Sequence, residues 1–302
     1  MPLALNRQPG LAARPWFHRI SVTDVTLPEG ARLACRVVNE LPTVRILFGS
    51  DWSAHTHDGP MHFPARPEGH SLFFGPQARA MAVAVEGSFQ VVTVNPAAGA
   101  AARLGQKDTQ ALVNRIVLLE ELSREFDIAN VLRPGGPALW LDNVDRALCR
   151  FVETRNPTPP DAIATRFDRA ALHDPTVSPA EIAAQCGVTL RTLERAVKRH
   201  FGLTPKRALR RARALDMVAM LLGVAEPDEE AEMRLRYFDE PHLNREMRHF
   251  FDLTPGQLRD NRHPLLRITA EIRQARRLEE LAVLPRGTMP SWRDPEAEPE
   301  SR

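Results

Sequence analysis

The pattern of apolar and polar positions changes near residue 108, and this change divides the chain into two unlike parts. Up to about residue 95, short runs of apolar and β-branched residues are separated by turns rich in glycine and proline, which predicts β-strands. A succession of short strands is typical of a small barrel or sandwich. The expected strands cover residues 20–26, 32–38, 43–48, 81–85 and 89–94.

From Asp108 onward the apolar positions recur with the period of a helix. A break rich in proline and glycine follows at residues 133–137, and a second helix is expected at residues 141–153. The proline-rich segment 156–160 predicts a stiff linker between domains. We expect the first helix to pack on its own domain rather than to form a dimer seam. Its apolar stripe consists of Leu112, Ile116, Leu119, Leu122 and Phe126.

Beyond the linker the chain is predicted to be almost wholly helical. Three helix starts are specified by a hydroxyl residue followed by proline, at Ser178, Thr204 and Thr254. An additional amphipathic stretch covers residues 265–278, and the acidic, proline-rich residues 294–300 are expected to be disordered. The expected helices are residues 161–173, 179–186, 190–200, 205–222, 229–236, 240–251 and 255–261.

One segment of this helical part occurs twice. Residues 193–205 (LERAVKRHFGLTP) return at residues 243–255 as LNREMRHFFDLTP, with six identities. A repeat with helix-like apolar positions and arginines suggests one small helical unit used twice. Two basic helices at fixed separation suggest a double-stranded polymer as the partner.

Charge is distributed unequally between the two copies. The net charge of the whole chain is only +2, yet residues 178–213 contain nine Lys/Arg and two acidic residues, a local charge of +7. Residues 228–262 contain six arginines and nine acidic residues, a local charge of −3. The first copy is therefore expected to contribute more of any binding to a polyanion.

The first copy has the layout of a helix-turn-helix: a short helix, a turn at Gly187-Val188, and a second helix whose expected N-cap is Thr189. On a helical wheel, Leu190, Leu193 and Val197 share the face that is expected to be buried, and basic residues cover the opposite face. Residues near the N-terminus of such a helix enter the major groove first, and those further along contact phosphates. We expect base contacts from Arg191, Thr192 and Arg195, and phosphate contacts from Lys198 and Arg199 and, if exposed, from Arg207, Arg210 and Arg211.

In the second copy, the expected buried face contains Leu243, Met247, Phe250 and Phe251. The opposite face is polar but less basic, and Glu240 and Glu246 would repel phosphate if they pointed at it. The expected base contacts are His242 and Arg245, and the expected phosphate contact is Arg248.

These residues resemble the AraC/XylS family of bacterial transcription regulators, over about residues 161–260. The resemblance rests on several short motifs taken together. It implies two helix-turn-helix units joined by a long helix, with recognition helices 190–200 and 240–251 in successive major grooves, ~34 Å apart. The motifs are Ile182-Ala183 with Gly187, TLER at 192–195, FGLTP at 201–205, YFDEPHLNR at 237–245 and FDLTP at 251–255 with Arg259.

The expected fold is therefore α+β, in four parts. They are a β-rich, cupin-like barrel as the sensor domain at residues 1–107, a helical connector at 108–155, an all-α double helix-turn-helix domain at 161–263, and an extra helix with an acidic tail at 264–302. The β-rich part resembles the family's divergent sensor domains around Gly75-Pro76-Gln77.

The second unit departs from the family pattern at its turns. Arg236 replaces the usual glycine, Glu232 and Met233 stand where small residues usually pack, and Asp252 stands where the first copy has Gly202. A residue other than glycine is tolerated at such a turn if its φ is negative. The second unit is therefore expected to be distorted or weaker at DNA.

Two other functions compete with DNA binding. His55 and His57 resemble the HxH motif of metal-binding cupins, but Asp58 to Met61 occupy the region where a glutamate is expected, so we expect exposed histidines and no metal site. A protein-interaction adaptor with weakened DNA binding is the third hypothesis, prompted by the acidic second copy. No P-loop, GxGxxG, GxSxG or HExxH pattern occurs, and neither an enzyme nor a cofactor is expected.

The expected compartment is the bacterial cytoplasm, at the nucleoid. The three cysteines, Cys35, Cys149 and Cys186, are far apart and lack a CxxC pair, which disfavours disulfides and structural zinc. No run of eighteen apolar residues predicts a membrane span. The expected partners are double-stranded DNA and RNA polymerase. The residues leave open whether the N-terminal part binds a small-molecule effector, forms a homodimer or contacts another protein.

Overall fold

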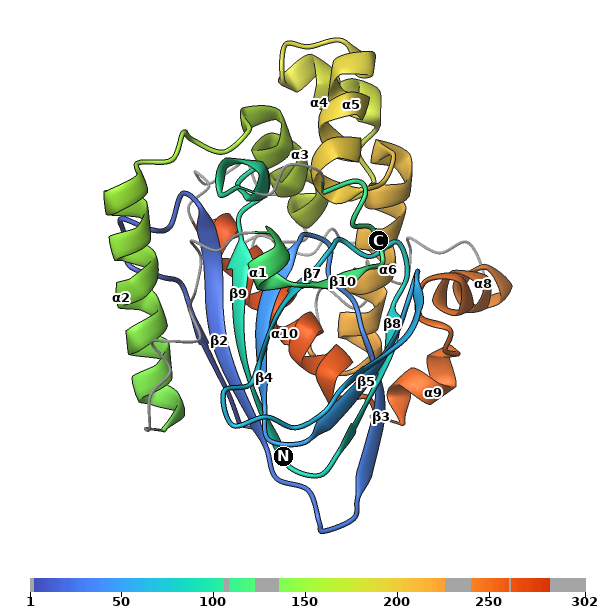
Figure 1. Cartoon of the computed structure of the whole chain (residues 1–302). Coiled ribbons are helices and arrows are strands. Elements are labelled where there is room, and N and C mark those ends of the chain that lie inside the picture. Colours follow the sequence, from blue (N-terminus) through green and yellow to red (C-terminus); the bar gives the residue numbers. More distant parts are fainter. Residues whose placement is uncertain (1–2, 106–108, 123–135, 226–239, 261, 283–302) are drawn as a thin grey trace.

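The computed structural model describes residues 3–105, 109–122, 136–225, 240–260 and 262–282, which form a β-rich N-terminal domain and a helical C-terminal part (Figure 1). The five strands expected from the sequence are confirmed, and further short strands join them. The strands are β1 Leu3–Arg7, β2 Phe17–Val25, β3 Arg32–Val37, β4 Thr43–Phe48, β5 Asp51–Thr56, β6 Gly59–Phe63, β7 His70–Phe74, β8 Met81–Glu86, β9 Phe89–Pro96 and β10 Ile116–Leu118.

In the described residues the strands form two antiparallel sheets, so of the small barrel and the sandwich that short strands predict, the structure has the sandwich. The larger sheet has the order β1-β2-β9-β4-β7-β10, and the smaller has the order β3-β8-β5-β6. Apolar side chains from both sheets, among them Val37, Leu72 and Val83, form a common core between them. The fold is therefore a pair of facing sheets, with the outer face of the larger sheet left to be covered by a helix.

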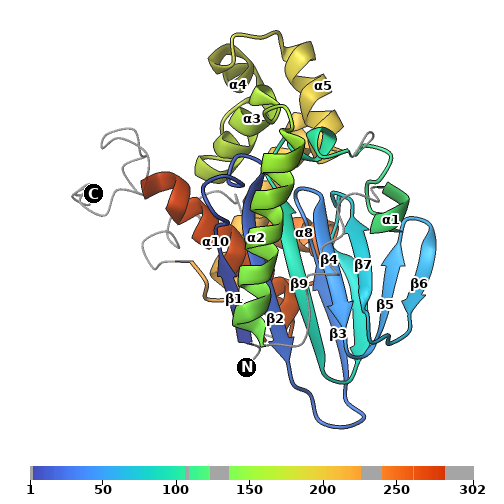
Figure 2. The ribbon, with the colours of Figure 1, turned by 60° about the vertical axis from the view of Figure 1, so that its left-hand side comes forward.

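Helix α2 (Pro137–Arg155) covers that outer face, as Figure 2 shows. Its side chains Trp140, Val144 and Leu148 pack on Ile20 and Val92 of the sheet in one buried cluster. The helix predicted at 141–153 is confirmed, and it packs on its own domain. The helix predicted from Asp108 is wrong in the described part: residues 116–118 form β10, which pairs with β7, and α1 (Leu119–Leu122) is a single turn.

The C-terminal part consists of helices that begin where the capping residues predict. Ser178 and Thr254 form capping boxes with Glu181 and Gln257, and the Thr204 hydroxyl accepts a hydrogen bond from the backbone amide of Arg207. The helices are α3 Ala162–His173, α4 Pro179–Gln185, α5 Leu190–Phe201, α6 Pro205–Leu221, α8 Glu240–Phe251, α9 Pro255–Arg259 and α10 Pro264–Ala282. The helix predicted at 229–236 and the acidic tail lie outside the described residues.

None of the helices in the described ranges combines the length and apolar character that a membrane crossing requires.

The long helix α10 joins the two halves of the molecule through a buried ion-pair cluster. Asp216 of α6, which is 1% exposed, accepts hydrogen bonds from Arg273 and Arg277 of α10. Arg273 also pairs with Glu40 of the β-rich domain. Since a buried charge without a partner is strongly unfavourable, the position of α10 depends on this carboxylate.

The linker ends at a second polar contact. Asp161 caps α3 by accepting hydrogen bonds from the amides of Ile163 and Ala164, and its carboxylate lies 3.6 Å from Nε2 of His200 on α5. The contact with His200, together with the two amide hydrogen bonds, holds the pKa of Asp161 well below its usual value.

Asp216→Asn should destabilise the protein by about 3–5 kcal/mol, because it leaves Arg273 and Arg277 without their shared carboxylate. Urea denaturation of the full chain measures the change. Glu86→Gln, at an exposed pair with Arg32, is the control and should change stability by less than about 1 kcal/mol. Equal effects of the two substitutions would contradict the central role of Asp216.

Asp161→Asn should flatten the dependence of stability on pH, because asparagine keeps the helix cap but not the charge. The lowered pKa of Asp161 means that its contribution is present above the unfolded pKa, about 4, and is lost as pH falls below it. Thermal unfolding between pH 7 and pH 2 should therefore show the wild type more stable at pH 7, with the difference shrinking in acid. Glu29→Gln, in an exposed turn, is the control; a difference independent of pH would contradict the argument.

Candidate nucleic-acid interface

The first of the two helices predicted to contact DNA, α5, is positioned by signals at both of its ends. The Thr189 hydroxyl accepts a hydrogen bond from the Thr192 amide, and Gly202 ends the helix in the left-handed conformation, with φ 68°. Before α5, Gly187 makes the turn from α4 with φ 66°, a conformation that favours glycine. Local sequence alone thus specifies the helix, the turn and the next helix.

The buried face of α5 packs into the core of its own domain. Leu193, Val197 and Phe201 are at most 2% exposed, and the Phe201 ring contacts Phe167 of α3 edge to face. Leu190 is an exception to the predicted buried face: it is 44% exposed, because it lies in the first turn, beyond the end of the core.

The opposite face of α5 presents basic groups to solvent. Arg191, Arg195 and Arg199 are exposed at four-residue intervals, and Thr192 and Lys198 are half-buried. A row of guanidinium groups on a helix of about 10–12 Å diameter fits a major groove about 12 Å wide. The residues predicted for DNA contact on α5 therefore lie together on one accessible face.

The arginines of α6 divide into exposed and occupied groups. Arg207 is exposed, but the guanidinium of Arg210 donates to both carboxylate oxygens of Glu246, at 2.8 Å to Oε2. Arg211 is 1% exposed and donates to the backbone carbonyls of Gln77 and Glu40, and burial lowers its pKa to about 10. Arg211 was expected to contact phosphate only if it was exposed, and it is buried.

The second helix predicted to contact DNA, α8, has a smaller basic face. Arg245 and Arg248 are exposed, and His242 is half-buried. Glu246, expected to repel phosphate if it faced DNA, is instead 3% exposed and turned toward Arg210 of α6. The helical wheel did not predict the burial of Glu246, because a wheel shows one helix alone and not the neighbouring helix that carries Arg210.

The end of α8 repeats the geometry of α5 with a less suitable residue. Asp252 has φ 56°, close to the 68° of Gly202 at the equivalent position, so it adopts the left-handed conformation rather than the negative φ that would make it tolerable. Aspartate tolerates this conformation better than most residues, at a cost that glycine does not have. The Asp252 carboxylate pairs with Arg36 of the β-rich domain at 2.8 Å.

Both recognition helices contact the β-rich domain at their C-terminal ends. A Cβ at Gly202 would lie 2.1 Å from Val113, which shows how closely α5 approaches that domain. For α8, the Ala80 amide donates to the Phe250 carbonyl at 2.6 Å, and Arg79 donates to Nδ1 of His249 at 3.4 Å. These contacts involve the C-terminal ends of the two helices. The base contacts are expected at the opposite, N-terminal ends. Burial and the nearby Arg79 lower the pKa of His249.

The histidines of the alternative metal site lie on the smaller sheet. His55 is exposed at the end of β5, His57 is exposed in the following turn, and His62 lies 3.6 Å from Asp51. In the described part of the chain, no three histidine, cysteine, aspartate or glutamate side chains are grouped so that they could hold a metal ion.

Comparison with known proteins matches the same region of the chain. Residues 169–261 match the family described as "Helix-turn-helix domain". Over 86 residues the chain is 35% identical to the HTH-type transcriptional activator RhaS of Klebsiella pneumoniae (strain 342). This match covers 28% of the present chain and 31% of the length of RhaS.

Two solved structures are similar to this chain at low sequence identity. Apo ToxT K231A from Vibrio cholerae strain SCE256 is 9% identical with a TM-score of 0.46, over 83% of this chain and 97% of that one. ToxT from Vibrio cholerae O395 is 6% identical with a TM-score of 0.47, over 80% and 96%. The sequence matches concern the helical part of the chain, and they identify residues 169–261 as a helix-turn-helix domain of the AraC type.

Proposed function

We propose that this protein is a sequence-specific DNA-binding transcription regulator. The observation that supports this most directly is the exposed row of Arg191, Arg195 and Arg199 on α5, whose opposite face is buried in a domain of the helix-turn-helix family. Exposed guanidinium groups at helical spacing can reach both guanine edges in the major groove and the phosphates beside it.

The roles divide along α5. Arg191, Thr192 and Arg195 lie in the first half of the helix and read base edges, where an arginine donates two hydrogen bonds to guanine. Lys198, Arg199 and, at the start of α6, Arg207 contact phosphates, which fixes the register of the helix on the duplex. Arg210 and Arg211 serve the protein's own assembly, so the charge available to DNA is smaller than the local +7.

The second unit makes the smaller contribution to affinity. Its α8 carries His242 and Arg245 as base-reading residues and Arg248 as a phosphate contact. With α5 and α8 in successive major grooves, the target contains two half-sites about one helical turn, ~34 Å, apart. Two unequal units make the first half-site the stronger determinant of binding.

The regulator acts at the nucleoid in the bacterial cytoplasm, with double-stranded DNA as its first partner and RNA polymerase as the second. The residues proposed to read bases lie on the recognition helices and not on the β-rich domain. The β-rich domain can therefore bind an effector or a second copy of the chain.

Binding-site selection with the purified full chain, followed by a salt titration on the selected duplex, tests this function. Each phosphate contact should steepen the slope of log K against log salt by about 0.9, because contacts to phosphate release counterions. If the protein binds all duplexes equally and its affinity does not change with salt concentration, the proposed function is refuted.

Arg191→Ala should relax base preference at one position of the selected site, whereas Arg199→Ala should weaken all sequences about equally and reduce the salt slope by about 1. Fluorescence anisotropy on the selected duplex and on single-base variants measures both effects. Arg150→Ala removes an exposed arginine from α2, which packs on the larger sheet, and is the matched control that should change neither. Identical behaviour of the Arg191 and Arg199 variants would contradict the division of roles.

A further inference from the structure

Part of the inner face of the larger sheet is polar where an apolar core would be expected. Ser21 of β2 lies opposite Thr93 of β9, and Thr93 lies opposite Arg45 of β4, so the three side chains form one row across the sheet. Thr23 and Thr43, two positions along their strands, point to the same face. Ser21, Thr23, Thr43 and Thr93 are all at most 8% exposed. Since burying polar groups is unfavourable unless they are hydrogen-bonded, this face requires an explanation.

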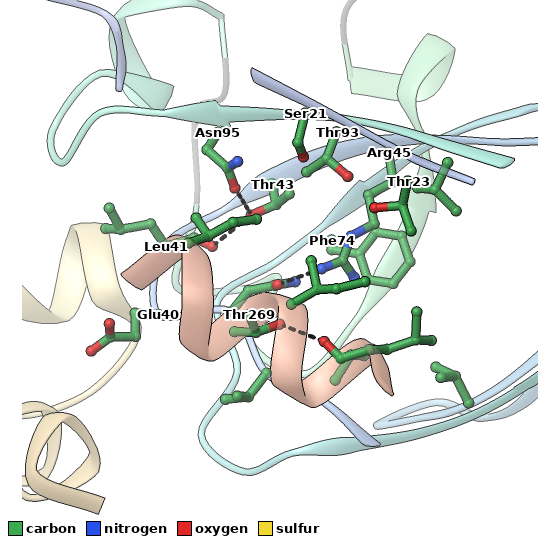
Figure 3. A pocket seen from close by; sticks show the side chains of 18 of the residues that line it. Ser21, Thr23, Glu40, Leu41, Thr43, Arg45, Phe74, Thr93, Asn95 and Thr269 are labelled. Atoms are coloured by element: carbon green, nitrogen blue, oxygen red, sulfur yellow. Dashed lines mark hydrogen bonds between the residues drawn. The ribbon is translucent and has the colours of Figure 1, made fainter. Parts of the chain in front are cut away.

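These side chains line a cavity of about 120 Å³ between the two sheets and α10 (Figure 3). The polar row forms one wall, and Trp52 and Phe63 of the smaller sheet form part of another. Helix α10 completes the enclosure with Ile268 and Ile272. The cavity therefore has a polar side and an apolar side, which is typical of sites for small organic molecules.

The polar side carries a positive charge that no carboxylate balances. Arg45 lies with its guanidinium 4.7 Å from the centre of the Phe74 ring and donates to Oδ1 of Asn39 at 2.9 Å. No ion pair with Arg45 occurs among the described residues, and burial lowers its pKa to about 10, which leaves it protonated at neutral pH. Figure 3 shows Arg45 beside Phe74, with Thr23 and Thr93 close by.

The cavity lining also contains three hydrogen-bond donors without partners. Nδ2 of Asn39, Nε1 of Trp52 and Nδ2 of Asn95 are buried atoms that form no hydrogen bond. Asn39 and Trp52 are themselves 7% and 6% exposed. The unmet groups are all donors, and the unbalanced charge is a cation, so the lining lacks an acceptor with negative charge.

The remaining charged groups of the lining are balanced. Glu40 pairs with Arg273, and Arg276 pairs with Asp168 of α3. His18 accepts or donates at the Pro96 carbonyl, and burial with the nearby Arg276 and Arg19 lowers its pKa well below its usual value, so it is neutral at pH 7. Arg45 is thus the charge around which a ligand would be organised.

We propose that the cavity between the sheets and α10 binds a small carboxylate, whose oxygens accept hydrogen bonds from Arg45 and the unpartnered amide donors, and whose apolar body lies against Ile268, Ile272 and the smaller sheet. An engineered cavity of ~150 Å³ accommodates benzene, so the ligand is a short acid about the size of benzoate rather than a long-chain one. Neither the charge nor the donors take part in DNA binding, so this site does not depend on the function proposed above.

The probes are benzoate, hexanoate and palmitate, with benzamide as the uncharged counterpart of benzoate. Thermal unfolding of the full chain with each probe at about 10 mM, or at saturation for palmitate, detects binding to the folded state, and calorimetry measures the affinity. We expect benzoate or hexanoate to raise the midpoint of unfolding, and benzamide and palmitate to have no effect.

Arg45→Gln keeps a hydrogen-bonding group in place and removes the charge. It should weaken benzoate or hexanoate about tenfold or more, because charge-assisted hydrogen bonds are roughly twice as strong as neutral ones. Without ligand the variant should be at least as stable as the wild type, since the substitution removes an unbalanced charge. Arg66→Gln, at an exposed loop of the same domain, is the matched control and should bind as the wild type does.

Three results would overturn the proposal. They are no response to either short acid, equal responses to benzoate and benzamide, and undiminished binding by Arg45→Gln. Because DNA affinity is measured separately, failure here leaves the proposed regulatory function to its own test.

Discussion

The arrangement of the two halves of this protein depends on one buried carboxylate. Asp216 lies on α6, between the two predicted helix-turn-helix units, and pairs with two arginines of α10. One of these, Arg273, continues to Glu40 in the β-rich domain. A charge of this kind is stable in the interior only while its partners stay in place, so the connecting helix, the C-terminal helix and the sheets are positioned together.

The packing of the two halves uses basic residues that the sequence alone would assign to DNA binding. Arg210 holds Glu246 of the second recognition helix, and Arg211 holds two carbonyls of the β-rich domain. Both lie on the same helix as Arg207, which is exposed. A run of arginines on one helix therefore serves two purposes, and we propose nucleic-acid contact only for arginines that this packing does not use.

The helical domain could be predicted closely because its signals are local. Capping residues such as Ser178 and Thr189 and the turn at Gly187 act within a few positions, and the structure confirms the helices they predict. Predictions were wrong where a distant part of the chain determines the local structure. Residues 116–118 show helical spacing, but they form a strand because they pair with β7.

The same limit applies to the candidate sites. The wheel separated the exposed arginines of α5 from its core, but it gave no means of knowing that Glu246 would be buried beside Arg210. The polar inner face around Arg45 was missed as well. Its signal was present in the sequence, since Thr43 and Arg45 alternate with the apolar Val44 and Ile46, but strand pairing is needed to place Ser21 and Thr93 beside them.

The attachment of both proposed recognition helices to the β-rich domain has a consequence for the DNA. Because α5 meets this domain at Gly202 and α8 meets it at Phe250 and Asp252, a third body sets the distance and angle between them. Inserting one base pair between half-sites moves the second by about 3.4 Å and rotates it by about 35°. Because bending α6 alone cannot compensate for such a change, we expect this protein to tolerate a substituted base more readily than an altered spacing.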